Sequence, residues 1–89
     1  MAWKIDLSNQ AQQDLDQLDP QIARRILRFL NQRVAPLDDP RSIGESLTGS
    51  RLGEFWKYRV GDYRIICRIE DHILTVFVVR IGNRGQVYR

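Results

Sequence analysis

The stretch "FWKYRVGDYRIICRI" (residues 55–69) alternates apolar with mostly cationic residues on both sides of Gly61 and Asp62. Alternation with a period of two predicts half-buried β-strands, and a Gly-X dipeptide between two such runs predicts a tight hairpin turn. We therefore expect strands at Phe55–Val60 and Tyr63–Glu70, joined as an antiparallel hairpin.

The turn sets the register of this hairpin, because directly opposed residues of antiparallel strands share one face of the sheet. Arg59 should lie opposite Arg64, and Lys57 opposite Ile66. The face that they share gathers the cations of the hairpin, namely Lys57, Arg59, Arg64 and Arg68. The other face carries the side chains that we expect to pack into the core: Trp56, Tyr58, Val60, Tyr63, Ile65, Cys67 and Ile69.

The formal charge of +3 over 89 residues is unevenly distributed. Residues 1–50 hold six Lys and Arg against seven Asp and Glu, whereas residues 51–89 hold eight against four. Like charges placed opposite each other destabilise a strand pair, so a sequence that keeps them predicts an anion between them. A basic second half predicts a polyanionic ligand or substrate. The alternative is a merely soluble basic surface, although such surfaces usually mix both signs.

The first half of the chain predicts a short strand followed by two helices. "WKIDL" alternates, Ser8 suits an N-cap, and a helix is expected from there through Asp19. Asp19 and Pro20 then suit the N-cap and the first position of a second helix. The apolar positions repeat at helical spacing: Ala11, Leu15 and Leu18 in the first helix, and Ile22, Ile26, Phe29, Leu30 and Val34 in the second.

After these helices, residues 35–54 are rich in Pro, Gly and small polar residues, and we expect a long loop with little structure of its own. A last strand is predicted at Ile73–Arg80, after a turn at Asp71 and His72. The chain is therefore predicted to be a single α+β domain, residues 1–89, with the order β-α-α-β-β-β. The helical hairpin should pack on one face of a mostly antiparallel sheet.

Some sites and locations are disfavoured by the sequence. The beginning lacks the apolar core of a signal peptide, and no apolar run is long enough to span a bilayer, so we expect a cytoplasmic protein without membrane contact. Cys67 is the only cysteine and His72 the only histidine, so we expect no disulfide, metal or other cofactor. Arg24, Arg25 and Arg28 on the second helix are interpreted as a solvated face rather than a binding site.

The cationic face suits chemistry on RNA. Guanidinium groups donate bidentate hydrogen bonds to phosphate and can stabilise the extra charge of a pentacoordinate transition state. A lysine among arginines has its charged form disfavoured, which makes Lys57 the candidate proton acceptor. The tail "IGNRGQVYR" adds Arg84 as a donor and Tyr88 as an aromatic that can stack on a base. We expect the side chains of Lys57, Arg64 and Arg84 to lie at the surface.

Nearly the whole chain resembles the RelE toxins of the RelE/ParE superfamily. The resemblance lies in the hairpin run "FWKYRVGDYRIICRI", in the following run "TVFVVRIGNRGQVYR" and in the predicted order of helices and strands. The resemblance implies a ribosome-dependent endoribonuclease that cuts mRNA in the A site of the 70S ribosome by attack of the RNA 2′-hydroxyl, without a metal. It also implies inhibition by a RelB-like antitoxin, and a toxin–antitoxin complex that binds its own operator DNA through the antitoxin.

The resemblance further implies roles for individual residues. Lys57 and Arg59 match the proton acceptor and the group that stabilises phosphate charge, and Arg64 matches a phosphate-binding arginine. Arg84 matches the donor to the leaving 5′-oxygen, and Tyr88 matches the tyrosine that stacks on or orients a base. Arg51, Arg68 and Arg80 are further candidates for binding RNA phosphate. Thr48 stands where relatives have an arginine, so that role is either lost or taken by Arg51.

The sequence leaves two other functions open. ParE-type toxins have the same fold and poison DNA gyrase without cutting RNA, but they generally lack the basic and aromatic set found here. A non-catalytic nucleic-acid-binding module is the other alternative. The fold does not decide among these three, because function resides in the site.

Overall fold

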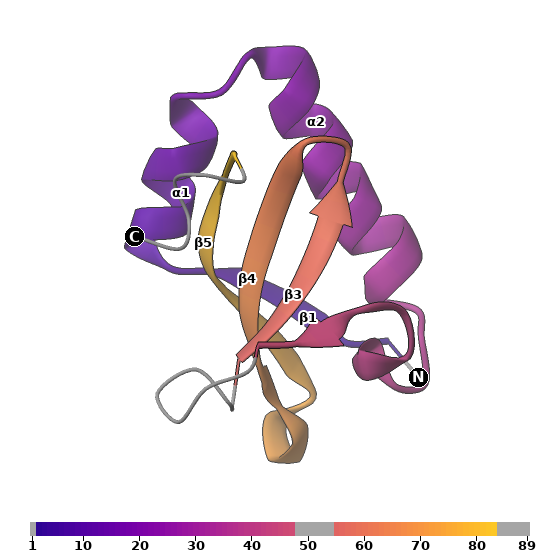
Figure 1. Ribbon diagram of the computed structural model, residues 1–89. Coiled ribbons are helices and arrows are strands. Elements are labelled where there is room, and N and C mark those ends of the chain that lie inside the picture. The colour runs from indigo at the N-terminus through magenta and orange to yellow at the C-terminus, as the bar shows by residue number, and fades with distance from the viewer. Residues whose placement is uncertain (1, 48–54, 84–89) are drawn as a thin grey trace.

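In the computed structural model, which describes residues 2–47 and 55–83, five strands form one mixed sheet. The strands are β1 (Lys4–Leu7), β2 (Glu45–Ser46), β3 (Phe55–Val60), β4 (Tyr63–Glu70) and β5 (Thr75–Asn83). Their spatial order is β1-β5-β4-β3-β2, and Figure 1 shows β5, β4 and β3 side by side. Strand β1 is parallel to β5, and the other neighbouring pairs are antiparallel, which confirms the predicted α+β class.

The β3–β4 hairpin has the bounds and the register that the alternation predicts. Arg59 lies opposite Arg64, and Lys57 lies opposite Ile66. Gly61 has a φ of 59°, a left-handed conformation that glycine adopts without steric cost, so this position accounts for the tight turn. The residues predicted to face the core are buried (Tyr58, Val60, Ile65 and Cys67) or partly buried against it (Trp56, Tyr63 and Ile69).

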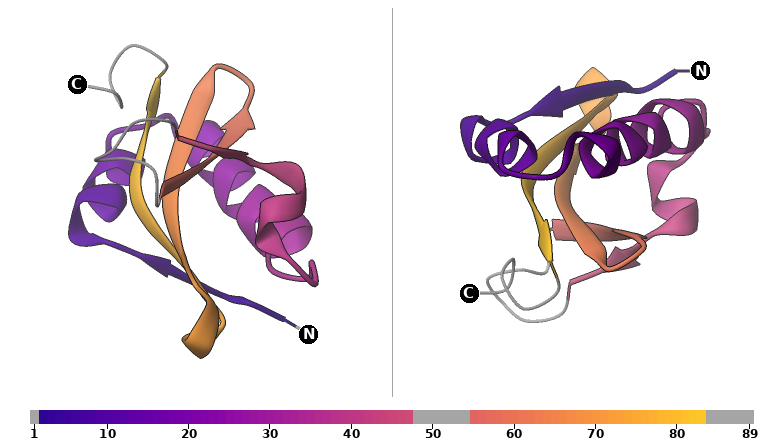
Figure 2. Two further views of the ribbon diagram at one scale, coloured as in Figure 1. Left: turned by 60° about the horizontal axis from the view of Figure 1, so that its bottom comes forward. Right: turned by 90° about the horizontal axis from the view of Figure 1, so that it is seen from above.

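Two helices, α1 (Asn9–Asp16) and α2 (Pro20–Phe29), cover one face of the sheet, and α2 continues into a π-helical turn, η1 (Leu30–Val34). Figure 2 shows α1 and α2 side by side on this face. Both predicted N-caps are confirmed, because the side chain of Ser8 accepts a hydrogen bond from the Ala11 N–H and that of Asp19 accepts one from the Gln21 N–H.

The first helix ends at Asp16, earlier than the predicted Asp19, because Asp19 must leave the helical conformation to cap α2. The apolar stripes meet the sheet as expected. Ala11, Ile26, Leu30 and Val34 are completely buried in one cluster with residues of β3, β4 and β5. None of the helices within the described part of the chain is long and apolar enough to cross a membrane.

The expectation that residues 35–54 have little structure of their own is wrong for residues 40–46. These residues form a 3₁₀ turn, η2 (Pro40–Ile43), and the short strand β2 beside β3. The predicted turn at Asp71 and His72 is a 3₁₀ turn, η3 (Asp71–Ile73), followed by Leu74 in the left-handed region with a φ of 49°. Strand β5 therefore begins at Thr75 rather than at Ile73, and it continues to Asn83, beyond the predicted end at Arg80.

Candidate functional site: a cationic pocket on strand β3

A small pocket of about 60 Å³ lies where β2, β3 and β4 meet. It is lined by Ile43, Gly44, Glu45, Lys57, Tyr58, Arg59 and Arg64. Three of the residues predicted to act on RNA, Lys57, Arg59 and Arg64, are thus brought together. The hairpin register explains their convergence, since it puts all three on the same face of adjacent strands.

The three cations have different surroundings. The Lys57 ammonium lies 3.5 Å from a carboxylate oxygen of Glu45, which pairs with Lys57 across β2 and β3. Arg59 is exposed, whereas Arg64 is only 8% exposed and donates a long hydrogen bond of 3.4 Å to the Tyr63 carbonyl. Among the residues that the structure describes, no carboxylate forms an ion pair with Arg59 or Arg64. These two guanidinium groups therefore have donors left for an anion.

Two features of the pocket differ from the sequence-based expectation. Arg64 was expected at the surface, but the sheet and its surroundings bury most of its side chain. Glu45 was not singled out, because its place opposite Lys57 depends on β2, a strand of two residues that has no periodic signal. Glu45 is the single acidic residue among the described residues that line the pocket.

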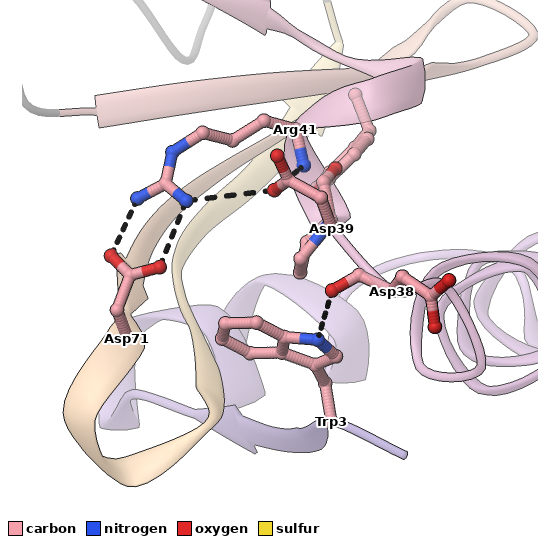
Figure 3. A network of polar contacts seen from close by, with 7 residues as sticks. Trp3, Asp38, Asp39, Arg41 and Asp71 are labelled. Atoms are coloured by element: carbon pink, nitrogen blue, oxygen red, sulfur yellow. Dashed lines mark hydrogen bonds and ion pairs between the residues drawn. The ribbon is translucent and has the colours of Figure 1, made fainter. Parts of the chain in front are cut away.

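Polar contacts from distant parts of the chain hold η2, and with it one wall of the pocket (Figure 3). Arg41 forms two hydrogen bonds with Asp71, of 3.0 and 2.8 Å. Asp39 caps the turn by accepting from the Arg41 N–H, and the Trp3 indole donates to the Asp38 carbonyl at 3.2 Å. The bonds with Arg41 lower the pKa of Asp71 below its ordinary value and raise the pKa of Arg41.

A buried hydrogen bond and a close packing contact complete the support of this wall. The Tyr58 hydroxyl donates to the Pro40 carbonyl at 2.6 Å, and burial raises the pKa of Tyr58. Gly44 lies against the Trp56 indole so closely that a Cβ at this position would be 2.0 Å from Nε1 and 2.9 Å from the Lys57 carbonyl oxygen. The segment between η2 and β2 therefore requires a residue without a side chain at position 44.

Arg68 and Arg80, both predicted to bind RNA phosphate, lie outside the residues that line this pocket. Arg68 forms an ion pair of 3.1 Å with Glu70, and its guanidinium lies 5.9 Å from the centre of the Phe77 ring. Arg80 donates to Asp14 of α1 at 3.1 Å. Both guanidinium groups already have carboxylate partners within the fold.

Asp14 also accepts a hydrogen bond of 2.9 Å from the Ile81 N–H. Strand β1 ends at Leu7, opposite Val78, so this part of β5 has no strand neighbour on that side. Burial by itself raises the pKa of Asp14, but the bonds from Ile81, Gln10 and Arg80 together lower it below its ordinary value. Asp14 thus satisfies the backbone N–H of Ile81 at the open edge of β5.

The remaining candidates are placed as follows. Arg51, Arg84 and Tyr88 lie outside the described residues, as does Thr48. Cys67 is fully buried, burial raises the pKa of its thiol, and its interpretation as a small core residue is confirmed. His72 is exposed in η3 and does not line the pocket.

Comparison with known proteins identifies the family of this chain. A family model described as "ParE toxin of type II toxin-antitoxin system, parDE" matches residues 5–88. This chain belongs to the RelE/ParE superfamily of toxins. The toxin is 29% identical to Toxin RelG of Mycobacterium tuberculosis over 89 residues, which cover 100% of this chain and 99% of RelG.

Solved structures show the same fold. The toxin resembles a chain of the toxin–antitoxin complex RelBE2 from Mycobacterium tuberculosis, with a TM-score of 0.85 and 26% identity over 97% of this chain and 95% of the other. A chain of the archaeal RelE–RelB complex from Pyrococcus horikoshii OT3 gives a TM-score of 0.68 at 23% identity, over 98% and 100% of the two chains. The predicted RelE-like fold is confirmed, and the protein is the toxin of a type II toxin–antitoxin system.

Proposed function

We propose that this toxin is an endoribonuclease that cleaves mRNA in the A site of the ribosome by metal-independent attack of the RNA 2′-hydroxyl. The observation that carries the proposal is the convergence of Lys57, Arg59 and Arg64 on one pocket. A phosphate seated there meets two guanidinium groups that have no carboxylate partner within the described part of the chain. The amine lies on the same face, where it can reach the attacking hydroxyl.

The reaction divides among these groups as follows. The 2′-oxygen attacks the neighbouring phosphorus and gives its proton to Lys57, since Arg59 and Arg64 stay protonated and cannot accept it. Arg59 and Arg64 stabilise the negative charge that develops on the phosphoryl oxygens. The bond from phosphorus to the 5′-oxygen breaks, which leaves a 2′,3′-cyclic phosphate and a 5′-hydroxyl.

Two further groups take part in the proposed reaction. Arg84, assigned from the family resemblance, protonates the leaving 5′-oxygen, and Tyr88 orients a base. The Glu45 carboxylate, 3.5 Å from the Lys57 ammonium, holds the lysine over the pocket between turnovers. The Lys57 side chain is 28% exposed, so the proton that it takes up can return to water directly.

A RelB-like antitoxin is the proposed inhibitor of this toxin. Two structural relatives come from complexes, the toxin–antitoxin complex RelBE2 and the archaeal RelE–RelB complex. An acidic antitoxin segment would meet the cationic face of β3 and β4 and neutralise the pocket, and the affinity should fall with salt where the contacts are exposed charges. The toxin–antitoxin complex would bind its operator DNA through the antitoxin. The site of action is the cytoplasm, where the 70S ribosomes are.

A second candidate function is the poisoning of DNA gyrase, because the matching family model carries the ParE description. The two functions make different demands on the pocket. RNA cleavage needs a proton acceptor and phosphate donors on one face, which the pocket supplies, whereas binding to gyrase does not need Lys57 as a base. A non-catalytic nucleic-acid-binding module would likewise bind RNA without needing Lys57.

Translation extracts programmed with one message test the proposal. EDTA-washed toxin is added with enough Mg²⁺ for the ribosomes, and cuts are mapped by primer extension. Wild-type toxin should cut the message, and Lys57→Ala should be about 10²–10⁴-fold slower, the range for loss of a general base. The matched control is Lys4→Ala, an exposed lysine of β1 whose ion pair with Asp6 is 3.8 Å long, and it should cut like wild type.

The outcomes separate the candidate functions. Intact message together with stalled gyrase–DNA complexes would transfer the assignment to ParE-like activity. RNA binding without any cut would favour the non-catalytic module. Arg59→Ala gives a cleaner test of phosphate stabilisation than Arg64→Ala, because Arg59 is exposed and Arg64 is buried, so loss of Arg64 can also lower stability. Removing such a charge donor should slow cleavage by about 10²–10³-fold.

A further inference from the structure

A second, larger hollow of about 540 Å³ lies between α2 with its extension η1 and the end of β3. Four of the residues that line it are arginines, namely Arg25, Arg28, Arg33 and Arg59, and none is acidic or a lysine. We call this hollow the arginine groove. Figure 1 shows α2 running beside the β3–β4 hairpin.

The charge of the arginine groove is not neutralised within the described residues. None of the ion pairs there includes any of the four arginines. Residues 20–34, which form α2 and η1, contain no Asp or Glu. Arg25 extends across to the hairpin turn, where its Nη1 lies 3.3 Å from the place that a Cβ of Gly61 would occupy. Arginines from the α2–η1 segment and from β3 thus line one groove that has no acidic residue among its described lining.

The arginine groove and the small pocket are neighbours. Arg59 and Ile43 line both of them, so an anion in the pocket and an anion in the groove would share the Arg59 guanidinium. From Arg25 to Arg33 the helical rise spans roughly 12 Å at 1.5 Å per residue. At about 3.4 Å per nucleotide in a stacked strand, that length spans several phosphates.

We infer that the arginine groove binds the phosphodiester backbone of the single-stranded RNA that continues from the nucleotide in the small pocket. This inference rests on the proposed function, because the strand enters the groove from the phosphate held by Arg59 and Arg64. Arginine suits this ligand, since its planar fork donates two parallel hydrogen bonds to a phosphate. An acidic peptide offers carboxylates to the same donors. Arg59 also lines the small pocket, however, and this favours the RNA strand whose reacting phosphate lies in that pocket.

Binding of uncleavable oligonucleotides tests the inference. We would use fluorescein-labelled 2′-O-methyl oligoribonucleotides, which lack the attacking hydroxyl, of about three and about nine nucleotides, and measure anisotropy over a range of salt. The longer strand should bind wild type more tightly than the short one. Arg28→Gln and Arg33→Gln should each weaken binding of the longer strand about fivefold. Each should also lower the slope of log K against log salt by about 0.7, with little effect on the short strand.

Arg24→Gln is the matched control, because Arg24 is exposed on the same helix but does not line the groove, and it should bind both strands like wild type. Thermal melts verify that each variant is folded, which is expected of exposed positions. Arg28→Lys keeps the charge but loses the fork, so it should recover part of the affinity. If Arg28→Gln and Arg33→Gln behave like Arg24→Gln, or if wild type gains nothing from strand length, the inference is overturned.

Two further comparisons separate this inference from the proposed function. Should wild type cut message in the translation extract while the variants at Arg28 and Arg33 bind RNA normally, the groove assignment fails alone. Should these variants lose the longer strand while wild type cuts no message, RNA binding in the groove stands and the cleavage proposal fails. Loss of binding to a polyglutamate peptide, with RNA binding unchanged, would assign the groove to an acidic peptide instead.

Discussion

Replacing Asp14 by alanine should lower the free energy of unfolding by about 2–3 kcal/mol. The Asp14 side chain is 10% exposed and accepts from the Ile81 N–H at 2.9 Å and from Arg80 at 3.1 Å. Ile81 is 2% exposed, so its N–H would stay buried without a partner, at a cost of about 1–3 kcal/mol. The half-exposed ion pair with Arg80 adds at most about 1 kcal/mol. For a domain of this size the melting temperature should fall by roughly 10–20 °C.

The pH dependence tests the same contact, because the folded-state pKa of Asp14 lies below the ordinary value of 3.8. A carboxyl group with a lowered pKa stabilises the fold above that value and loses this contribution as the pH falls through its folded pKa. Asp14→Asn keeps an oxygen for the Ile81 N–H but loses the charge. The difference in melting temperature between wild type and Asp14→Asn should therefore shrink from about pH 7 to about pH 3.

Thermal unfolding followed by circular dichroism measures both effects, with Asp16→Ala as the control for an exposed acidic residue of the same helix. The acid titration of Asp71, whose pKa is also lowered, occurs in all of these proteins and cancels in the difference. The reasoning fails if Asp14→Ala melts within about 3 °C of wild type, or if the difference between wild type and Asp14→Asn widens in acid.

Three further predictions concern the support of the pocket and the core. Gly44→Ala should cost about 1–3 kcal/mol in urea unfolding and change tryptophan fluorescence, because the new Cβ would overlap the Trp56 indole; unchanged values would contradict this packing. Tyr58→Phe should cost about 0.5–1.5 kcal/mol by leaving the buried Pro40 carbonyl without its donor, and an equal stability would refute the bond. Cys67 should resist iodoacetamide in the folded protein and react only in denaturant, as read by mass spectrometry.

Local signals predicted those parts of the fold that local interactions determine. The alternation on both sides of Gly61 gave the bounds and register of the hairpin, because a shift of one residue would turn every core side chain to the other face. Ser8 and Asp19 marked the starts of the two helices, because a side-chain cap acts on the next few residues only. The turn η2 and the strand β2 were missed, since they are held by partners far along the chain rather than by any periodic pattern.

For the candidate site too, the sequence predicted what the hairpin determines locally and missed what depends on tertiary packing. The convergence of Lys57, Arg59 and Arg64 follows from the hairpin register alone. The carboxylate partners of other cations did not follow, because they depend on tertiary packing. Arg80 binds Asp14, which lies 66 positions away in the sequence. The burial of Arg64 and the meeting of the α2 arginines with Arg59 likewise depend on how helices and strands pack, which composition does not reveal.

The parallel pairing of β1 with β5 has a consequence for synthesis of the toxin on the ribosome. Strand β5 lies between β1 and β4, yet it is the latest of the described strands to be translated. Until Thr75–Asn83 has emerged, β1 has no partner, and α1 lacks the strand against which it packs. The hairpin that carries Lys57 and Arg64 can form earlier, but without a completed core to hold it rigid. Nascent chains should therefore stay inactive until β5 is made, and truncation before Thr75 should abolish the whole fold rather than trim one edge.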